Sequence, residues 1–128
     1  MLVDRYGNPV ITFSTNEQKT GEKWIDGKPI YTKTIQKSYT GRSQLDDTVT
    51  FTSLGISNID NVFIDGGNSF VKFYIGGSYS GTQPLNINAG NDWKACYLRV
   101  SGVAFRMNQP GDYATEWYVT LKYTKTTD

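Results

Sequence analysis

The chain contains no histidine, and this limits the covalent chemistry that its side chains could perform. Histidine is the usual general base near neutral pH, the usual partner of a serine or cysteine nucleophile, and the commonest metal ligand. Carboxylates remain, and a pair of them could act on a sugar as a glycosidase does. Most of them stand in turn dipeptides, where aspartate is favoured because it hydrogen-bonds to nearby backbone. Examples are Asp65-Gly66, Asn91-Asp92 and Gly111-Asp112. We therefore expect a protein that is not an enzyme and that has no catalytic residues and no cofactor.

Asparagine and aspartate side chains are also concentrated in two segments, where their oxygens could bind calcium. The segments are Asn58 to Asn68 and Asn86 to Asp92. Neither has the spacing of a known calcium loop, so turn formation is the favoured interpretation. The single cysteine, Cys96, excludes an intramolecular disulfide and a cysteine-based zinc site. We expect no metal and interpret Cys96 as a small buried apolar residue.

Aromatic residues next to polar loops are better suited to binding a sugar. Sugar recognition sets an aromatic ring against the C–H face of the sugar, with polar groups on its hydroxyls. Tyr79 lies in a Gly/Ser-rich segment, and Trp93 follows Asn91-Asp92 at a predicted strand start. Tyr74, close to Tyr79 in sequence, is expected to point away from the core. The alternative is that Trp93 fills the core and Tyr79 packs across its own loop. The candidate ligand-binding residues are Tyr74, Tyr79, Asn91, Asp92 and Trp93.

These residues must be positioned by strands, because no segment shows sustained helical periodicity. Short alternating runs recur between turn signals, as is typical of an all-β antiparallel sandwich, jelly-roll-like, with about eight to ten strands. A closed barrel is the less supported alternative. We expect residues 1–128 to form one domain. The predicted strands are Val10 to Ser14, Pro29 to Tyr39, Thr48 to Leu54, Asn61 to Ile64, Ser69 to Ile75, Pro84 to Asn88, Trp93 to Val100, Gly102 to Met107 and Tyr113 to Lys125.

Alternation within these strands predicts which side chains face the core. In the last strand we assign Thr115, Trp117, Val119, Leu121 and Tyr123 to the core and Glu116, Tyr118, Thr120, Lys122 and Thr124 to the other face. In an earlier strand Val71, Phe73 and Ile75 are assigned to the core. Asp65 to Asn68 is predicted to be the turn of a hairpin, and Gly76 to Gln83 a flexible loop.

Charge and hydropathy exclude further classes of function. The net charge is +1, and the basic residues are scattered, which argues against nucleic acid and against a polybasic membrane patch. No apolar stretch approaches the length of a membrane span, and the chain starts with no secretory signal. We expect synthesis in a cytoplasm and no insertion into a membrane.

Near the start of the chain, the segment from Gly21 to Ile35 predicts a hairpin. Asp26-Gly27 is a tight-turn dipeptide, and Pro29, which has no N–H, places the return strand at an edge or a bulge. The block W-I-D-G-K-P-I-Y-T-K-T-I resembles one found in small β domains of tailed-bacteriophage structural proteins. The final stretch, from Trp117 to Asp128, resembles the closing strand of the same domains.

The resemblance implies a domain of a virion fibre, of the tail-fibre, receptor-binding or head-fibre type, with the C-terminal domain of a longer fibre as one arrangement. It implies localisation to the virion, a homotrimer, and contacts with other virion proteins. Within the matched blocks, Trp24, Tyr31, Trp117 and Tyr123 have the character of core or subunit-contact residues. Subunit contacts in such a trimer would account for Tyr31 and Tyr39, which share a strand face with two lysines. The expected function is attachment to a cell-surface polysaccharide of the bacterial host. The principal alternative is a purely structural head-fibre, decoration or baseplate module; a carbohydrate-binding module or a small glycan hydrolase is a third.

Overall fold

The computed structural model describes residues 5, 13–40, 44–85, 95–108 and 113–128. Within these residues the chain forms nine strands and one 3₁₀ helix, η1. None of the described residues belongs to a helix long and apolar enough to span a membrane. The elements are β1 (Gln18–Lys23), β2 (Pro29–Thr40), β3 (Gln44–Thr50), β4 (Ile59–Ile64), η1 (Gly66–Asn68), β5 (Phe70–Ile75), β6 (Ser78–Pro84), β7 (Ala95–Arg99), β8 (Gly102–Asn108) and β9 (Tyr113–Lys125).

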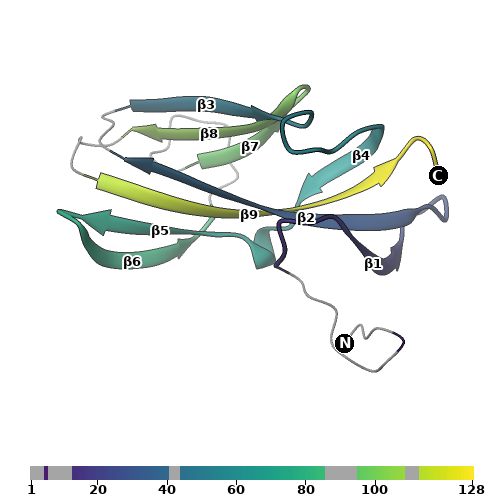
Figure 1. Ribbon diagram of the computed structural model, residues 1–128, viewed down its shortest axis with the longest axis horizontal. Coiled ribbons are helices and arrows are strands. Elements are labelled where there is room, and N and C mark those ends of the chain that lie inside the picture. Colours follow the sequence, from purple (N-terminus) through teal and green to yellow (C-terminus); the bar gives the residue numbers. More distant parts are fainter. Residues whose placement is uncertain (1–4, 6–12, 41–43, 86–94, 109–112) are drawn as a thin grey trace.

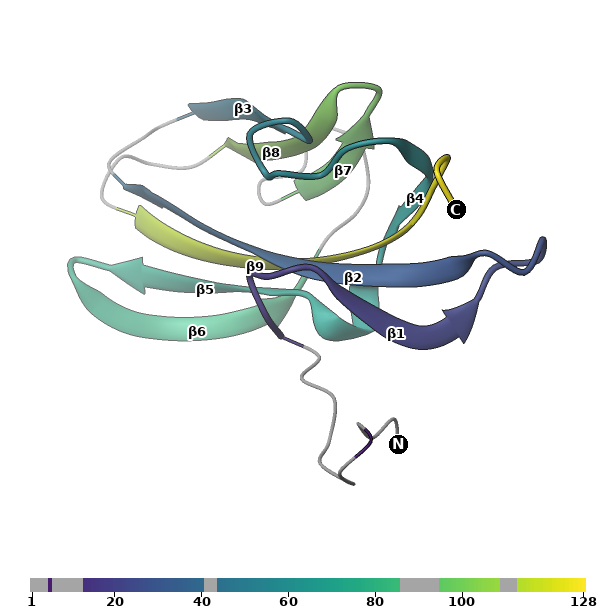
Figure 2. The same ribbon diagram turned by 45° about the vertical axis from the view of Figure 1, so that its right-hand side comes forward.

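The strands form two antiparallel sheets that face each other (Figure 1). The larger sheet has the order β1-β2-β9-β5-β6, and β4 pairs with β9 as well. The smaller sheet has the order β3-β8-β7. The larger sheet is strongly curled (Figure 2). The predicted fold class, an all-β antiparallel sandwich, is confirmed.

The hydrophobic core lies between the sheets, and β9 provides its centre. The five residues assigned to the core face of β9 are all buried: Thr115, Trp117, Val119, Leu121 and Tyr123. From the smaller sheet, Phe105 sets its ring edge-on to Trp117, with the ring centroids 5.4 Å apart. Cys96 is fully buried, as expected, and burial raises the pKa of its thiol to about 12. The alternation of β9 therefore predicted the core correctly.

Tyr31 and Tyr39 correct one prediction, because the side of β2 that carries them is the core side. Both are nearly buried, with 8% and 7% of their surface exposed. The ring of Tyr31 stacks on Tyr123, and its hydroxyl donates to Asp128 at 2.8 Å. The hydroxyl of Tyr39 donates to Asp47 at 2.6 Å. A buried tyrosine is stable when its hydroxyl finds such a partner, so no neighbouring subunit is needed to cover these rings.

Two lysines share this side of β2 with the tyrosines. Lys33 lies between buried neighbours and donates its ammonium to the carbonyl oxygen of Leu54. A lysine can bury its aliphatic stem in this way while its charged end finds an acceptor. Lys37 lies over the ring of Tyr39, with its ammonium 5.8 Å from the ring centroid.

The predicted hairpin around Asp65 to Asn68 is wrong. β4 and β5 do not pair with each other; both pair with β9, one after the other along the same edge. β4 lies opposite Leu121 to Lys125, and β5 lies opposite Tyr113 to Tyr118. The segment between them, with η1, is an interruption in one continuous edge. The turn residues are present because the backbone must leave the ladder there and return to it.

The segment from Gly76 to Gln83, predicted to be a loop, is mostly strand. Only Gly76-Gly77 forms the turn, both with positive φ, and β6 then pairs with β5. Gly81 lies under the ring of Phe73, which would be 2.9 Å from an added Cβ. Ile75, assigned to the core, is 40% exposed because it lies beside the turn at the tip of the sheet. The sequence did not predict β6 as a strand because glycine and serine residues, which are typical of loops, make up much of it.

The hairpin at Asp26-Gly27 is confirmed. Gly27 has φ +88°, and the Asp26 side chain accepts a hydrogen bond from the Lys28 backbone N–H at 3.0 Å. β1, which the list of predicted strands did not include, is the first strand of this hairpin. Its register against β2 shifts between Lys19 and Lys23, and Lys23 pairs with Pro29. The strand predicted from Thr48 to Leu54 starts and ends too far along the chain, because β3 ends at Thr50 and turns follow. Of the predicted first strand, Phe13 and Ser14 lie outside any strand, and the rest falls outside the described residues.

Candidate functional site

The outer face of the larger sheet, on the side away from the smaller sheet, collects aromatic and polar side chains from four strands. Since Trp117 and Val119 face the core, Glu116 and Tyr118 face outward. The strand register then places three rows of side chains across β2, β9, β5 and β6. We call these rows together the tyrosine face. The first row is Gln36, Tyr118, Phe70 and Pro84; the middle row is Ser38, Glu116, Lys72 and Thr82; the third row is Thr40, Ala114, Tyr74 and Tyr79.

The third row brings the predicted residues Tyr74 and Tyr79 together. Their ring centroids are 5.8 Å apart in an edge-to-face arrangement. Tyr79 is 59% exposed, and its hydroxyl shares a hydrogen bond with the Thr82 hydroxyl at 2.6 Å. The Tyr74 hydroxyl donates to the carboxylate of Glu116 at 3.5 Å. The predicted display of Tyr79 is confirmed, although it stands on a strand and not on a loop.

A β-bulge in β6 puts Tyr79 on this face. Phe73 pairs with Gly81, but the next residue, Tyr74, pairs with Tyr79, so Ser80 is an extra residue. In a regular ladder Tyr74 would lie opposite Ser80, and Tyr79 would point to the other side of the sheet. The Ser80 hydroxyl accepts a hydrogen bond from the Ile75 backbone N–H at 3.2 Å. The bulge therefore creates the tyrosine pair.

The first row holds a second aromatic group that sequence reasoning did not propose as a site. The rings of Phe70 and Tyr118 stack with their centroids 4.7 Å apart. Phe13 meets Phe70 edge-on, and Gln36 donates its amide N–H to the Tyr118 hydroxyl at 3.4 Å. Both stacked rings are partly buried. The outward position of Tyr118 was already implied by the alternation of β9, whereas that of Phe70 depends on its pairing with Tyr118.

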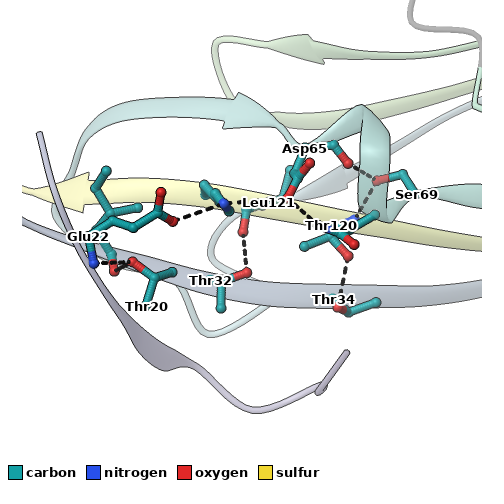
Figure 3. A network of polar contacts seen from close by, with 11 residues as sticks. Thr20, Glu22, Thr32, Thr34, Asp65, Ser69, Thr120 and Leu121 are labelled. Carbon is teal, nitrogen blue, oxygen red and sulfur yellow. Dashed lines mark hydrogen bonds and ion pairs between the residues drawn. The ribbon is translucent and has the colours of Figure 1, made fainter. Parts of the chain in front are cut away.

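A buried polar network fixes the start of β5 and so the position of Phe70 (Figure 3). The Asp65 N–H donates to the Thr120 carbonyl at 2.8 Å, and the Thr120 N–H donates to the Ser69 hydroxyl at 2.9 Å. The Ser69 hydroxyl in turn donates to the Asp65 carbonyl at 2.7 Å. On the other side of β9, the hydroxyls of Thr34 and Thr120 share a hydrogen bond of 3.0 Å. These bonds satisfy the backbone groups that the interruption between β4 and β5 would leave without partners.

Lys122 extends the network toward β1. Its ammonium lies 3.0 Å from Glu22 and 3.5 Å from Asp65. Burial lowers the pKa of Lys122, but the two carboxylates outweigh it, and the pKa lies above its ordinary value. Lys122 therefore links β9 to β1 and to the segment between β4 and η1.

The carboxylates that might have bound calcium in the first predicted segment have protein partners. Asp60 accepts a hydrogen bond from the Lys28 ammonium at 2.7 Å, and Asp65 accepts one from the Asn68 amide at 2.7 Å. The described part of the chain contains no cluster of histidine, cysteine, aspartate or glutamate that could hold a metal ion. The second segment, Asn86 to Asp92, lies outside the described residues. The candidate residues Asn91, Asp92 and Trp93 also lie outside them.

Comparison with family models, with curated proteins and with solved structures found no match to this chain.

The side chains of the tyrosine face are of the kinds that could bind a ligand without covalent chemistry. The face combines ring faces with a carboxylate, an ammonium and hydroxyls, the groups that proteins set against sugars. Of the described residues on this face, only Glu116 carries a carboxylate, so the face alone does not supply the two carboxyl groups of a glycosidase.

Proposed function

We propose that this chain is an attachment domain of a bacteriophage virion fibre and that it binds a polysaccharide of the host surface through the tyrosine face. The observation that carries the proposal is the exposed ring of Tyr79, which packs edge-on against Tyr74 and shares a hydrogen bond with the hydroxyl of Thr82. Tyr74 in turn donates its hydroxyl to the carboxylate of Glu116. The phage setting is supported by the resemblance at the two ends of the sequence.

The tyrosine pair suits a weak and selective sugar site. The Tyr79 ring is held by neighbours on its own sheet, so little conformational entropy is lost when a sugar covers it. The Thr82 hydroxyl can donate or accept a hydrogen bond and the Glu116 carboxylate can accept one, and such bonds distinguish one sugar from another. In a homotrimer three such faces would act together, and multivalency would strengthen attachment without new contacts.

A purely structural role in the virion is the second candidate, and two exposed apolar residues favour it. Ile25, at the tip of the β1–β2 turn, is 95% exposed, and Val100, in the β7–β8 turn, is fully exposed. Other virion proteins could cover these tips. Against this role, the outer face that we describe is rich in hydroxyls and charges and is not an extended apolar surface for self-association.

The test is binding of fluorescently labelled protein to a panel of bacterial strains, with the variants Tyr79→Ala and Tyr97→Ala. Tyr97 is a matched control because it lies on the outer face of the smaller sheet. We expect strain-selective binding that Tyr79→Ala weakens at least about tenfold, or ~1.4 kcal/mol, and that Tyr97→Ala leaves unchanged. Equal binding by both variants would refute the site. Absence of binding to every strain would favour the structural role. Trp93→Ala, tested alongside, examines the remaining predicted aromatic residue.

A further inference from the structure

We infer that the ligand of the tyrosine face is an extended oligosaccharide that runs along the strands and contacts both aromatic rows, with its middle sugar over Glu116 and Lys72. This inference rests on the proposed function and adds a second aromatic subsite, Tyr118 and Phe70, to the tyrosine pair. A single sugar would occupy only one row.

The spacing of the rows sets the length of the ligand. Tyr118 and Ala114 are four residues apart on β9, as are Phe70 and Tyr74 on β5. At the rise of a β-strand, four residues span about 13 Å. This distance exceeds the width of one sugar ring, so only a chain of several sugars can contact the first and the third row together.

The middle row provides polar groups for the sugar between the two aromatic rows. The Glu116 carboxylate is held by the Tyr74 hydroxyl of the third row, at 3.5 Å. The Lys72 ammonium is turned toward the first row, 5.7 Å from the Tyr118 ring centroid. Each charged group thus connects the middle row to one aromatic row. A sugar placed there would find a hydrogen-bond acceptor and a donor.

The face also has an end, which bounds the ligand. The next pair along β2 and β9 beyond the first row is Thr34 and Thr120, which are 4% and 0% exposed. Their hydroxyls bond to each other, and the Thr120 N–H bonds to Ser69 (Figure 3). These groups have no free surface to offer a sugar. At the opposite end the third row lies beside the Gly76-Gly77 turn. Three rows therefore define the length of the site.

The test uses capsular polysaccharides and lipopolysaccharide O-chains purified from a panel of strains. Any polysaccharide that binds is cut into size-graded fragments of one to eight sugars, and the affinity of each fragment is measured by calorimetry or NMR titration. We expect the affinity to rise at least about tenfold with length until both rows are bridged, and then to level off.

Variants separate the rows. Tyr118→Ala should reduce the affinity for long fragments to that for short ones and leave the shortest fragments unaffected. Tyr79→Ala should weaken all lengths, and Tyr97→Ala none. Since Tyr118 is partly buried and stacks on Phe70, Lys72→Ala provides a second variant that removes a middle-row contact without deleting a stacked ring. Circular dichroism checks the fold of each variant.

The outcomes distinguish this inference from the proposed function. Affinity that does not depend on length, lost in Tyr79→Ala but kept in both Tyr118→Ala and Lys72→Ala, would overturn the extended site and leave attachment through the tyrosine pair standing. If no purified polysaccharide binds the wild-type protein, the proposed function fails and the inference fails with it.

Discussion

Replacing Trp117 by alanine tests the assignment of faces in β9, on which the tyrosine face depends. Trp117 is fully buried and lies between Glu116 and Tyr118 in sequence, so its burial is what places these two neighbours outside. Its ring contacts Phe105, and its indole N–H donates to the Thr115 hydroxyl at 2.9 Å.

The expected loss follows from the size and burial of the ring. Truncating a fully buried tryptophan to alanine removes its transfer free energy and leaves a cavity, which together cost about 3–5 kcal/mol. The lost hydrogen bond adds little, because Thr115 keeps a contact from its hydroxyl to the sulfur of Met107 at 3.8 Å. For a domain of this length, about 3–5 °C of melting temperature accompany each kcal/mol, so we expect a fall of about 10–20 °C.

The assay is urea and thermal unfolding followed by circular dichroism, which does not depend on the tryptophan that is removed. Trp24→Ala is the matched control, because Trp24 is only partly buried and packs on Phe63 at the outer face. We expect that control to cost about 1 kcal/mol. A loss below ~1 kcal/mol for Trp117→Ala, or equal losses in the two variants, would show that the faces of β9 are reversed and would remove the basis for the tyrosine face.

Three further predictions concern stability and reactivity. Gly102→Ala should lower the free energy of unfolding in urea by about 1–3 kcal/mol, because an added Cβ would lie 2.7 Å from the Thr50 Cα in the backbone of β3. Gly66→Ala is the control and should be nearly neutral, because an added Cβ there meets nothing within 4 Å. Burial raises the pKa of Glu17, but hydrogen bonds from Lys125 and a tyrosine outweigh it and hold the pKa below its ordinary value of 4.5. The ionised Glu17 therefore stabilises the folded state above that pH, and this stabilisation is lost as the pH falls through the lowered pKa. Glu17→Gln should flatten the acid side of a plot of unfolding free energy against pH, and an unchanged slope would contradict this. Cys96 should resist a thiol reagent until the protein unfolds, and rapid labelling of the native protein would show that it is accessible.

The features that the sequence predicted well are those decided by local chemistry. The alternation of β9 assigned Trp117 to the core because side chains in a strand change face at every residue. The Asp26-Gly27 turn was found because its backbone requirement and its side-chain hydrogen bond lie within a few residues. The small residues around Tyr79 predicted that its side chain would be exposed, but they did not predict that it lies on a strand.

The features that the sequence missed depend on which strand pairs with which. Nothing local to Asp65 to Asn68 shows that β4 and β5 both pair with β9, because the length of β9 decides it. The bulge at Ser80, which turns Tyr79 outward, is visible only in the register of β5 and β6. The sequence left Tyr31 between the core and a subunit contact, and its stacking on Tyr123 across the β2–β9 pair places it in the core. Phe70 joined the site only through its long-range pairing with Tyr118.

The central position of β9 in the larger sheet has a consequence for biosynthesis. β2, β4 and β5 all pair with β9, yet β9 follows every other strand in this sequence. A nascent chain that has not yet released residues 113–125 from the ribosome holds β2 and β5 with their edges open and with the core side of the sheet uncovered. Partners far apart in sequence must then meet late, which is the topology of slow folding and of early exposure to aggregation. Co-translational folding of the larger sheet is thus postponed until its central strand, β9, emerges.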